Sequence, residues 1–232
     1  DASLGMFFVG VTYYDGQGFM VPKSLNVKSA KQMKGATVCV QSGTTTELNL
    51  TDYSRANKLD LKPVVFEKVE AATGALFAGR CQVYPTDASG LASVRAKEAQ
   101  KPDDYVILPE LISKEPLGPS VRRGDDEFFT INKWVLYALL DAEEQGVTQA
   151  NVDQMKKDSK NPVVMRLLGS GTEDTGKLLG LDKDWAYRVI KATGNYGEIF
   201  ERNVGEKTPI GLPRGLNNLW TNGGVHYAPP IR

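Results

Sequence analysis

The alternation of short apolar runs with helical segments between residues 34 and 100 constrains the fold more than any other feature of this chain. Three β-rich runs, at 36–41, 63–67 and 81–85, are each followed by a segment with helical character. Strands that alternate with helices pair in parallel, because each helix crosses one face of the sheet and returns the chain in the same direction. This region therefore predicts an α/β unit with a parallel sheet and helices on both faces.

The pattern changes after a turn-rich stretch at residues 114–119. Apolar residues then recur at spacings of three and four over 128–142 and again over 185–200, which is typical of amphipathic helices that pack on a core. The strand signal at residues 7–14 has no earlier strand to pair with. We expect a domain boundary near the turn-rich stretch and a mainly helical unit beyond it.

Charge and residue counts exclude several classes of function. The 28 basic residues balance 28 acidic ones without a long run of one sign, so we expect neither nucleic acid nor an anionic membrane surface as a partner. His226 is the sole histidine, and two cysteines are too few for a structural zinc site, so we predict no metal and no cofactor. No pair of side chains in the sequence suggests general acid–base catalysis, and the chain is predicted not to be an enzyme.

Cys39 and Cys81 are the two cysteines of the chain. An even count suits one disulfide in an oxidising compartment, but two buried free thiols in a reducing compartment would give the same sequence. Composition leaves both alternatives open.

The segment from Gln41 to Glu47 runs from a strand end through Gly43 into the first turn of a helix. A helix N-terminus presents unpaired N–H groups and a positive dipole, so it can bind a carboxylate or phosphate, and the hydroxyls of Thr44 and Thr45 would add donors. The alternative is an ordinary helix cap in which a Ser or Thr hydroxyl and the Glu47 carboxylate use those donors themselves.

Asp87 follows the third β-rich run, at the carboxyl end where open α/β sheets bind ligands. Its carboxylate could hold an ammonium group, or it could cap the helix that follows. Together, Asp87 and the turn at Gly43 offer one group for each end of a zwitterion.

The sequence resembles the polar amino-acid family of periplasmic solute-binding proteins, and within it the general L-amino-acid binding branch. The resemblance extends over essentially the whole chain. The segments that carry it are residues 13–21, 38–50, 112–119, 194–203, 215–220 and 227–230.

The resemblance implies a two-lobed periplasmic-binding-protein fold with hinges at residues 14–18 and 115–119, in which an amino acid is trapped when the lobes close. The first lobe would comprise 1–18 and 116–232, and the second α/β lobe 19–115. Gly43, Thr44 and Thr45 would hold the α-carboxylate of an L-amino acid, and Asp87 its α-ammonium group. The resemblance also implies a periplasmic location, a Cys39–Cys81 disulfide between neighbouring strands, and delivery of the ligand to the membrane permease of an ABC importer.

The chain departs from the family pattern at its start, since family members carry an N-terminal segment that completes the first lobe and supplies an arginine to the ligand carboxylate. The resemblance therefore predicts a complete second lobe and an incomplete first lobe. Its apolar faces would be covered by a separate N-terminal fragment, by strand exchange with a second copy of the chain, or by a rearrangement of the first lobe itself. An alternative is a truncated paralogue that does not transport and acts as an interaction or oligomerising protein.

Overall fold

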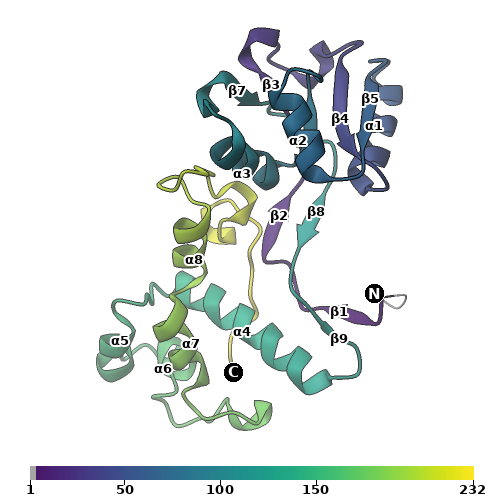
Figure 1. Cartoon of the computed structure of the whole chain (residues 1–232). Helices are drawn as coiled ribbons and strands as arrows, with labels where there is room; N and C mark the ends of the chain where they lie inside the picture. The colour runs from purple at the N-terminus through teal and green to yellow at the C-terminus, as the bar shows by residue number, and fades with distance from the viewer. Residues whose placement is uncertain (1–3) are drawn as a thin grey trace. The chain divides into compact units, whose positions relative to one another are not determined.

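The computed structural model describes residues 4–232, which divide into two units. The sheet unit comprises residues 14–116 and 209–212, and the helical unit comprises residues 4–13, 117–208 and 213–232. The chain passes from one unit to the other within strands β2 and β8, which pair with each other (Figure 1), and again on either side of residues 209–212. Whether each unit folds as a separate domain with the predicted limits at residues 18 and 116 stays a prediction.

The elements of the sheet unit follow the predicted alternation of strands and helices. They are β2 (Tyr13–Asp15), β3 (Gln17–Pro22), β4 (Thr37–Gln41), α1 (Thr45–Ala56), β5 (Lys62–Phe66), α2 (Val69–Phe77), β6 (Tyr84–Asp87), α3 (Ala88–Glu98), β7 (Tyr105–Ile107) and β8 (Glu115–Leu117).

The strands joined by helical crossovers are parallel, as predicted: β4 pairs with β5 in parallel, and a parallel bridge joins Val38 of β4 to Val83 just before β6. The expectation of a wholly parallel sheet is wrong, however, because β3 pairs antiparallel with both β6 and β7. No helical crossover leads into β3, which follows β2 directly, so the crossover argument does not apply to it.

Side chains alternate between the two faces of the sheet, and each face has its own core. Val38 and Val40 pack with Leu50 of α1 on one face, whereas Cys39 packs with α2 residues such as Leu76 on the other. Leu91 of α3 joins the second cluster. Helices therefore cover both faces, as the sequence predicts.

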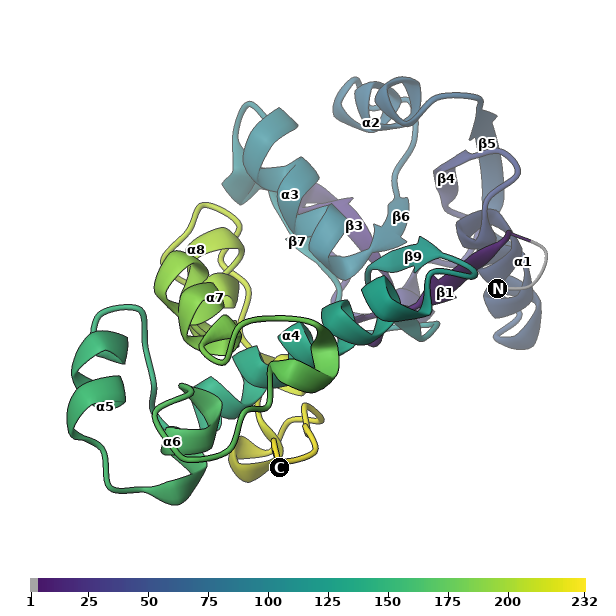
Figure 2. The ribbon, with the colours of Figure 1, turned by 90° about the horizontal axis from the view of Figure 1, so that it is seen from below.

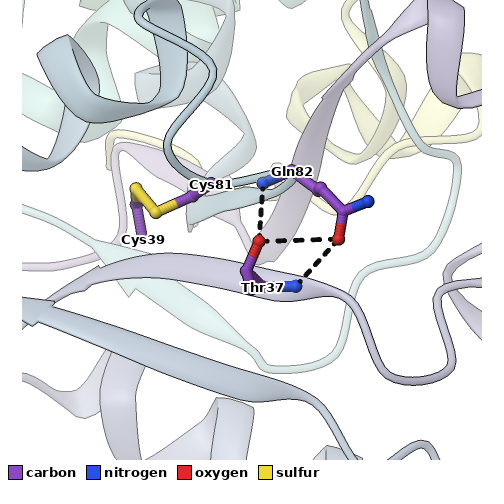
Figure 3. Close-up of a disulfide and its surroundings, with 4 residues drawn as sticks. All are labelled: Thr37, Cys39, Cys81 and Gln82. Atoms are coloured by element: carbon purple, nitrogen blue, oxygen red, sulfur yellow. Dashed lines mark hydrogen bonds between the residues drawn. A yellow bond between two sulfur atoms is a disulfide. The ribbon is translucent and has the colours of Figure 1, made fainter.

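The two cysteines form a disulfide, which settles the alternative that composition left open. Cys39 in β4 is bonded to Cys81, and their Cα atoms are 5.6 Å apart (Figure 3). Cys81 precedes β6 rather than lying within a strand. Next to the disulfide, the backbone N–H of Gln82 donates to the Thr37 hydroxyl (3.2 Å), and the Thr37 N–H donates to the Gln82 side chain (3.1 Å).

The helical unit has a two-stranded antiparallel sheet and helices gathered around α4. Its elements are β1 (Met6–Phe8), β9 (Ser120–Arg122), α4 (Asp126–Glu144), α5 (Val152–Asp158), α6 (Pro162–Leu167), α7 (Trp185–Thr193) and α8 (Tyr196–Asn203). Figure 2 shows β1 and β9 side by side near the start of α4.

The core of this unit lies on two sides of α4. Ala138 and Ala142 pack with buried residues of α5, α6 and α7, among them Trp185, whereas Leu136 and Leu140 pack with α8 and the C-terminal tail. The spacing over 128–142 thus predicted the helix that organises this unit.

Two sequence-based expectations fail in the helical unit. The apolar periodicity over 185–200 is not one helix, because Gly194 adopts a positive φ of 77° and Asn195 starts a new helix, accepting from the Glu198 N–H and donating its own N–H to the Glu198 carboxylate. The strand signal at 7–14 is two strands, β1 and β2, each with its own partner.

Within residues 4–232, no helix is long and apolar enough to cross a membrane. The same residues contain no group of three or more His, Cys, Asp or Glu side chains that could hold a metal ion.

Candidate functional site

The predicted ligand-binding residues lie at one edge of the sheet unit. β4 ends at Gln41 and β6 ends at Asp87, and the Val38–Val83 bridge makes these two stretches parallel neighbours. Since parallel neighbours end at the same edge, the turn at Gly43 and the Asp87 carboxylate are both found at the carboxyl edge of the sheet.

The turn before α1 is a capped helix start. Gly43 has a φ of 70°, a conformation that side chains with a Cβ rarely adopt. Thr44 is the N-cap: its hydroxyl accepts from the Glu47 N–H (3.3 Å) and donates to the Gln41 carbonyl (2.9 Å). The Glu47 carboxylate accepts from the Gly43 N–H (2.8 Å). The capping interpretation is therefore correct for Thr44 and for the N–H of Gly43.

Capping leaves other donors of this turn free. The backbone N–H groups of Thr45 and Thr46, and the exposed Thr45 hydroxyl, have no hydrogen-bond partner anywhere in residues 4–232. They lie in the first turn of α1, where the helix dipole is positive. The cap and an anion site can thus coexist at this helix, on different donors.

Asp87 occupies the N-cap position of α3, but its side chain does not cap the helix. The carboxylate is half-buried and accepts no hydrogen bond from the described part of the chain. Burial raises the pKa of Asp87, and the carboxylates of Asp15 and Glu115 raise it further. A carboxylate in this environment is stabilised by a cation beside it.

Asp15 performs the capping that Asp87 does not. Its Oδ2 accepts from the N–H of Ser89 in the first turn of α3 (3.2 Å), and its Oδ1 accepts from the Gly16 N–H (2.8 Å). Glu115 is held by the Ser113 hydroxyl, which donates to it at 2.6 Å. Asp87 is the one of these three acids whose carboxylate has no donor among residues 4–232.

Asp15 and Glu115 were not predicted from the sequence as part of this site. Asp15 lies in one of the two hinge segments that the resemblance named and Glu115 in the other, so an acid in each hinge was the available signal. A cavity of about 540 Å³ in the sheet unit is lined by residues such as Lys34, Arg55 and Lys58, and it includes none of the predicted ligand-binding residues.

Curated relatives match the chain over its whole length. It is 60% identical to the general L-amino acid-binding periplasmic protein AapJ of Rhizobium johnstonii, covering 68% of that protein. It is 54% identical to the glutamate/glutamine/aspartate/asparagine-binding protein BztA of Rhodobacter capsulatus (68% covered), and 52% identical to the putative amino-acid ABC transporter-binding protein YhdW of Escherichia coli (67% covered). No protein-family model matches the sequence.

A solved structure matches the fold closely. The ABC transporter periplasmic binding protein from Brucella ovis, with glutathione bound, aligns with all of this chain and 73% of its own, with a TM-score of 0.95 and 54% identity. The names of these relatives describe solute-binding proteins. With whole-chain identities of 52–60% and this agreement in fold, the chain belongs to the family of periplasmic solute-binding proteins of amino-acid ABC transporters.

Proposed function

We propose that this chain binds the α-amino and α-carboxylate groups of an L-amino acid at the carboxyl edge of the sheet unit. Thr45, with Gly43 and Thr44 shaping the turn, would donate to the carboxylate, and Asp87 would accept from the ammonium group. The observation that carries the proposal is the Asp87 carboxylate, half-buried, close enough to two acids for their charges to raise its pKa, and without a donor within residues 4–232. An ammonium group would neutralise it and supply the missing donors.

We further infer that the chain works in the periplasm, delivers its ligand to an ABC permease and catalyses no reaction. The names of AapJ and YhdW support the first two inferences. The Cys39–Cys81 disulfide is compatible with an oxidising compartment. None of the relatives reported above is described as an interaction protein, so the truncated-paralogue alternative has no support.

The ligand class follows from what the ligands of the relatives share. General L-amino acids, the four ligands named for BztA and glutathione all present one free α-amino acid group, which in glutathione belongs to the γ-glutamyl residue. We therefore propose that the sheet unit recognises this common group, and that glutathione is a candidate ligand beside glutamate and glutamine.

Calorimetric titration with L-glutamate, L-glutamine, glutathione and glutarate tests the proposal, since glutarate is glutamate without its ammonium group. Asp87→Asn should weaken binding of the three amino-acid ligands by roughly tenfold to a hundredfold, the effect of losing one hydrogen bond between charged groups. It should leave glutarate unaffected or slightly favoured.

Asp60→Asn is the matched control, because Asp60 is exposed in the same unit and its left-handed backbone suits asparagine. Loss of affinity in both variants, or an equal change for glutamate and glutarate in Asp87→Asn, would contradict the assignment of Asp87 to the ammonium group. A chain that binds none of the ligands and self-associates would favour the interaction protein instead.

A further inference from the structure

Gln17 is a buried polar residue whose side chain links β3 to the start of α1. It lies at the first position of β3 with 1% of its surface exposed. Its Nε2 donates to the backbone carbonyl of Thr46 (3.1 Å), and its Oε1 accepts from Nδ2 of Asn49 (3.1 Å). Both partners belong to the first turns of α1.

The backbone of Gln17 lies next to the other half of the candidate site. In the β3–β6 pairing, Gln17 is directly opposite Asp87. One residue therefore contacts the strand end that carries the acid and the helix start that carries the free N–H groups. No other described side chain makes hydrogen bonds to both Thr46 and Asn49.

The position of Gln17 is itself closely fixed. Its N–H donates to the Ser113 hydroxyl (3.1 Å), and its carbonyl accepts from the Ile112 N–H (2.8 Å). On one side of it, a Cβ at Gly16 would approach the Ser113 carbonyl oxygen to 2.6 Å, which explains the glycine there. A shift of β3 would break these contacts, so the Gln17 amide is presented to α1 from a rigid support.

We propose that Gln17 is a positioning residue, which fixes the α1 turn at the distance from Asp87 that an α-amino acid spans. This inference rests on the proposed function. It makes Gln17, which would contact neither end of the ligand, responsible for the spacing between the two anchors, the α1 turn and Asp87. Without the Gln17 amide, the Thr46 carbonyl and the Asn49 amide lose buried partners, and the first turn of α1 loses its link to β3.

Hydrogen exchange tests the link without any ligand. In Gln17→Met, which keeps the length of the side chain and removes its polar atoms, amides 48–50 of α1 should exchange about tenfold faster, because local opening becomes easier by about the contribution of one buried hydrogen bond. Amides of α2 should keep their rates. Asn49→Ala, which removes one of the two bonds, should show a smaller change in the same amides.

Thr73→Val is the matched control, since Thr73 is equally buried in α2 and its hydroxyl bonds to the Glu70 carbonyl. This variant should alter exchange in α2 and not in α1. Equal changes in α1 and α2 in Gln17→Met, or no change in α1, would overturn the inference.

Ligand titration then separates positioning from general destabilisation. The ratio of the glutarate Kd to the glutamate Kd measures how well both anchors are used at once, and it should fall about tenfold in Gln17→Met and stay constant in Thr73→Val. An unchanged ratio in a variant that still binds glutamate would refute the role of Gln17. If the unmodified chain binds neither compound, the proposed function fails, and the exchange experiment still decides whether Gln17 holds α1.

Discussion

The interior of the sheet unit and the interior of the helical unit are stabilised by different chemistry. The sheet unit has a disulfide between Cys39 and Cys81 and places its unpaired acid, Asp87, at a strand end. The helical unit has no cysteine, and it buries titratable side chains such as Asp141 and His226 in its interior. A covalent link tolerates changes of pH, whereas buried titratable groups make stability depend on it.

Unfolding of the helical unit can be followed by a spectroscopic signal that the sheet unit does not give. All three tryptophans, Trp134, Trp185 and Trp220, belong to the helical unit. Tryptophan fluorescence therefore follows the helical unit, and circular dichroism follows both.

A cavity of about 300 Å³ with an apolar lining that includes Leu136, Tyr196 and Phe200 also lies in the helical unit.

The largest effect is expected from removal of the disulfide. Cys39→Ala with Cys81→Ala opens a link across 42 positions of sequence, which should cost about 4 kcal/mol in the free energy of unfolding of the sheet unit. In urea, the circular dichroism transition should move to lower concentration while the tryptophan transition stays in place. A tryptophan transition that moves equally would break the comparison, because the two units would then unfold together.

The second effect concerns two opposing pKa shifts in the helical unit. Burial and the charge of Arg214 lower the pKa of His226 to about 4. Burial and the charge of Glu144 raise the pKa of Asp141 to about 6, and this rise outweighs the lowering by a hydrogen bond from the backbone of Ile231. As the pH falls from 6.5 to 4, the unfolded chain takes up the histidine proton first, and stability is lost. Over nearly the same range the folded chain takes up the Asp141 proton first, and stability is gained.

The two contributions should nearly cancel, leaving the tryptophan transition almost constant between pH 6.5 and 4. Asp141→Asn removes the gain, so its stability should fall by about 3 kcal/mol over this range, at 1.36 kcal/mol per unit of pKa shift. His226→Gln should show the opposite slope of similar size. Parallel slopes in the two variants would contradict this assignment.

Arg214 is expected to have an intermediate effect on the helical unit. Its guanidinium pairs with Glu143 (3.0 Å), donates to the Asn217 carbonyl and lies over the rings of Tyr196 and Phe200. Arg214→Met keeps an apolar side chain at this position and leaves the largely buried Glu143 without its partner, so urea denaturation should show a loss of about 2 kcal/mol, the cost of one unsatisfied buried acceptor. Arg188→Met, at an exposed pair with Asp182, should leave the midpoint unchanged.

The smallest effect is expected at the cap of α1 in the sheet unit. Thr44→Ala removes the hydroxyl that accepts from the Glu47 N–H, and N-caps of this kind contribute about 1 kcal/mol. Thr44→Ser should restore most of the loss in thermal unfolding followed by circular dichroism. A fully stable Thr44→Ala variant would show that the Glu47 carboxylate caps the helix by itself.

Local sequence signals predicted most of the elements. The crossover strands and the helices at α1, α2 and α4 have apolar periodicities that depend on neighbours three or four positions away, so they could be recognised from the chain alone. The break at Gly194 and Asn195 was missed, although a glycine followed by a capping residue was the signal. The antiparallel strand β3 was missed because its partners are far away in the sequence.

The residue types at the candidate site could be predicted from the sequence, but the hydrogen bonds that they make could not. Gly43, Thr44 and Asp87 could be selected because strand ends and helix starts are readable locally. By itself, the sequence determined the alternation of elements, the fold family and which groups end at the carboxyl edge of the sheet. The tertiary structure alone decided that Asp15 caps α3 in place of Asp87 and that Gln17 links β3 to α1, because both depend on contacts between residues distant in the chain.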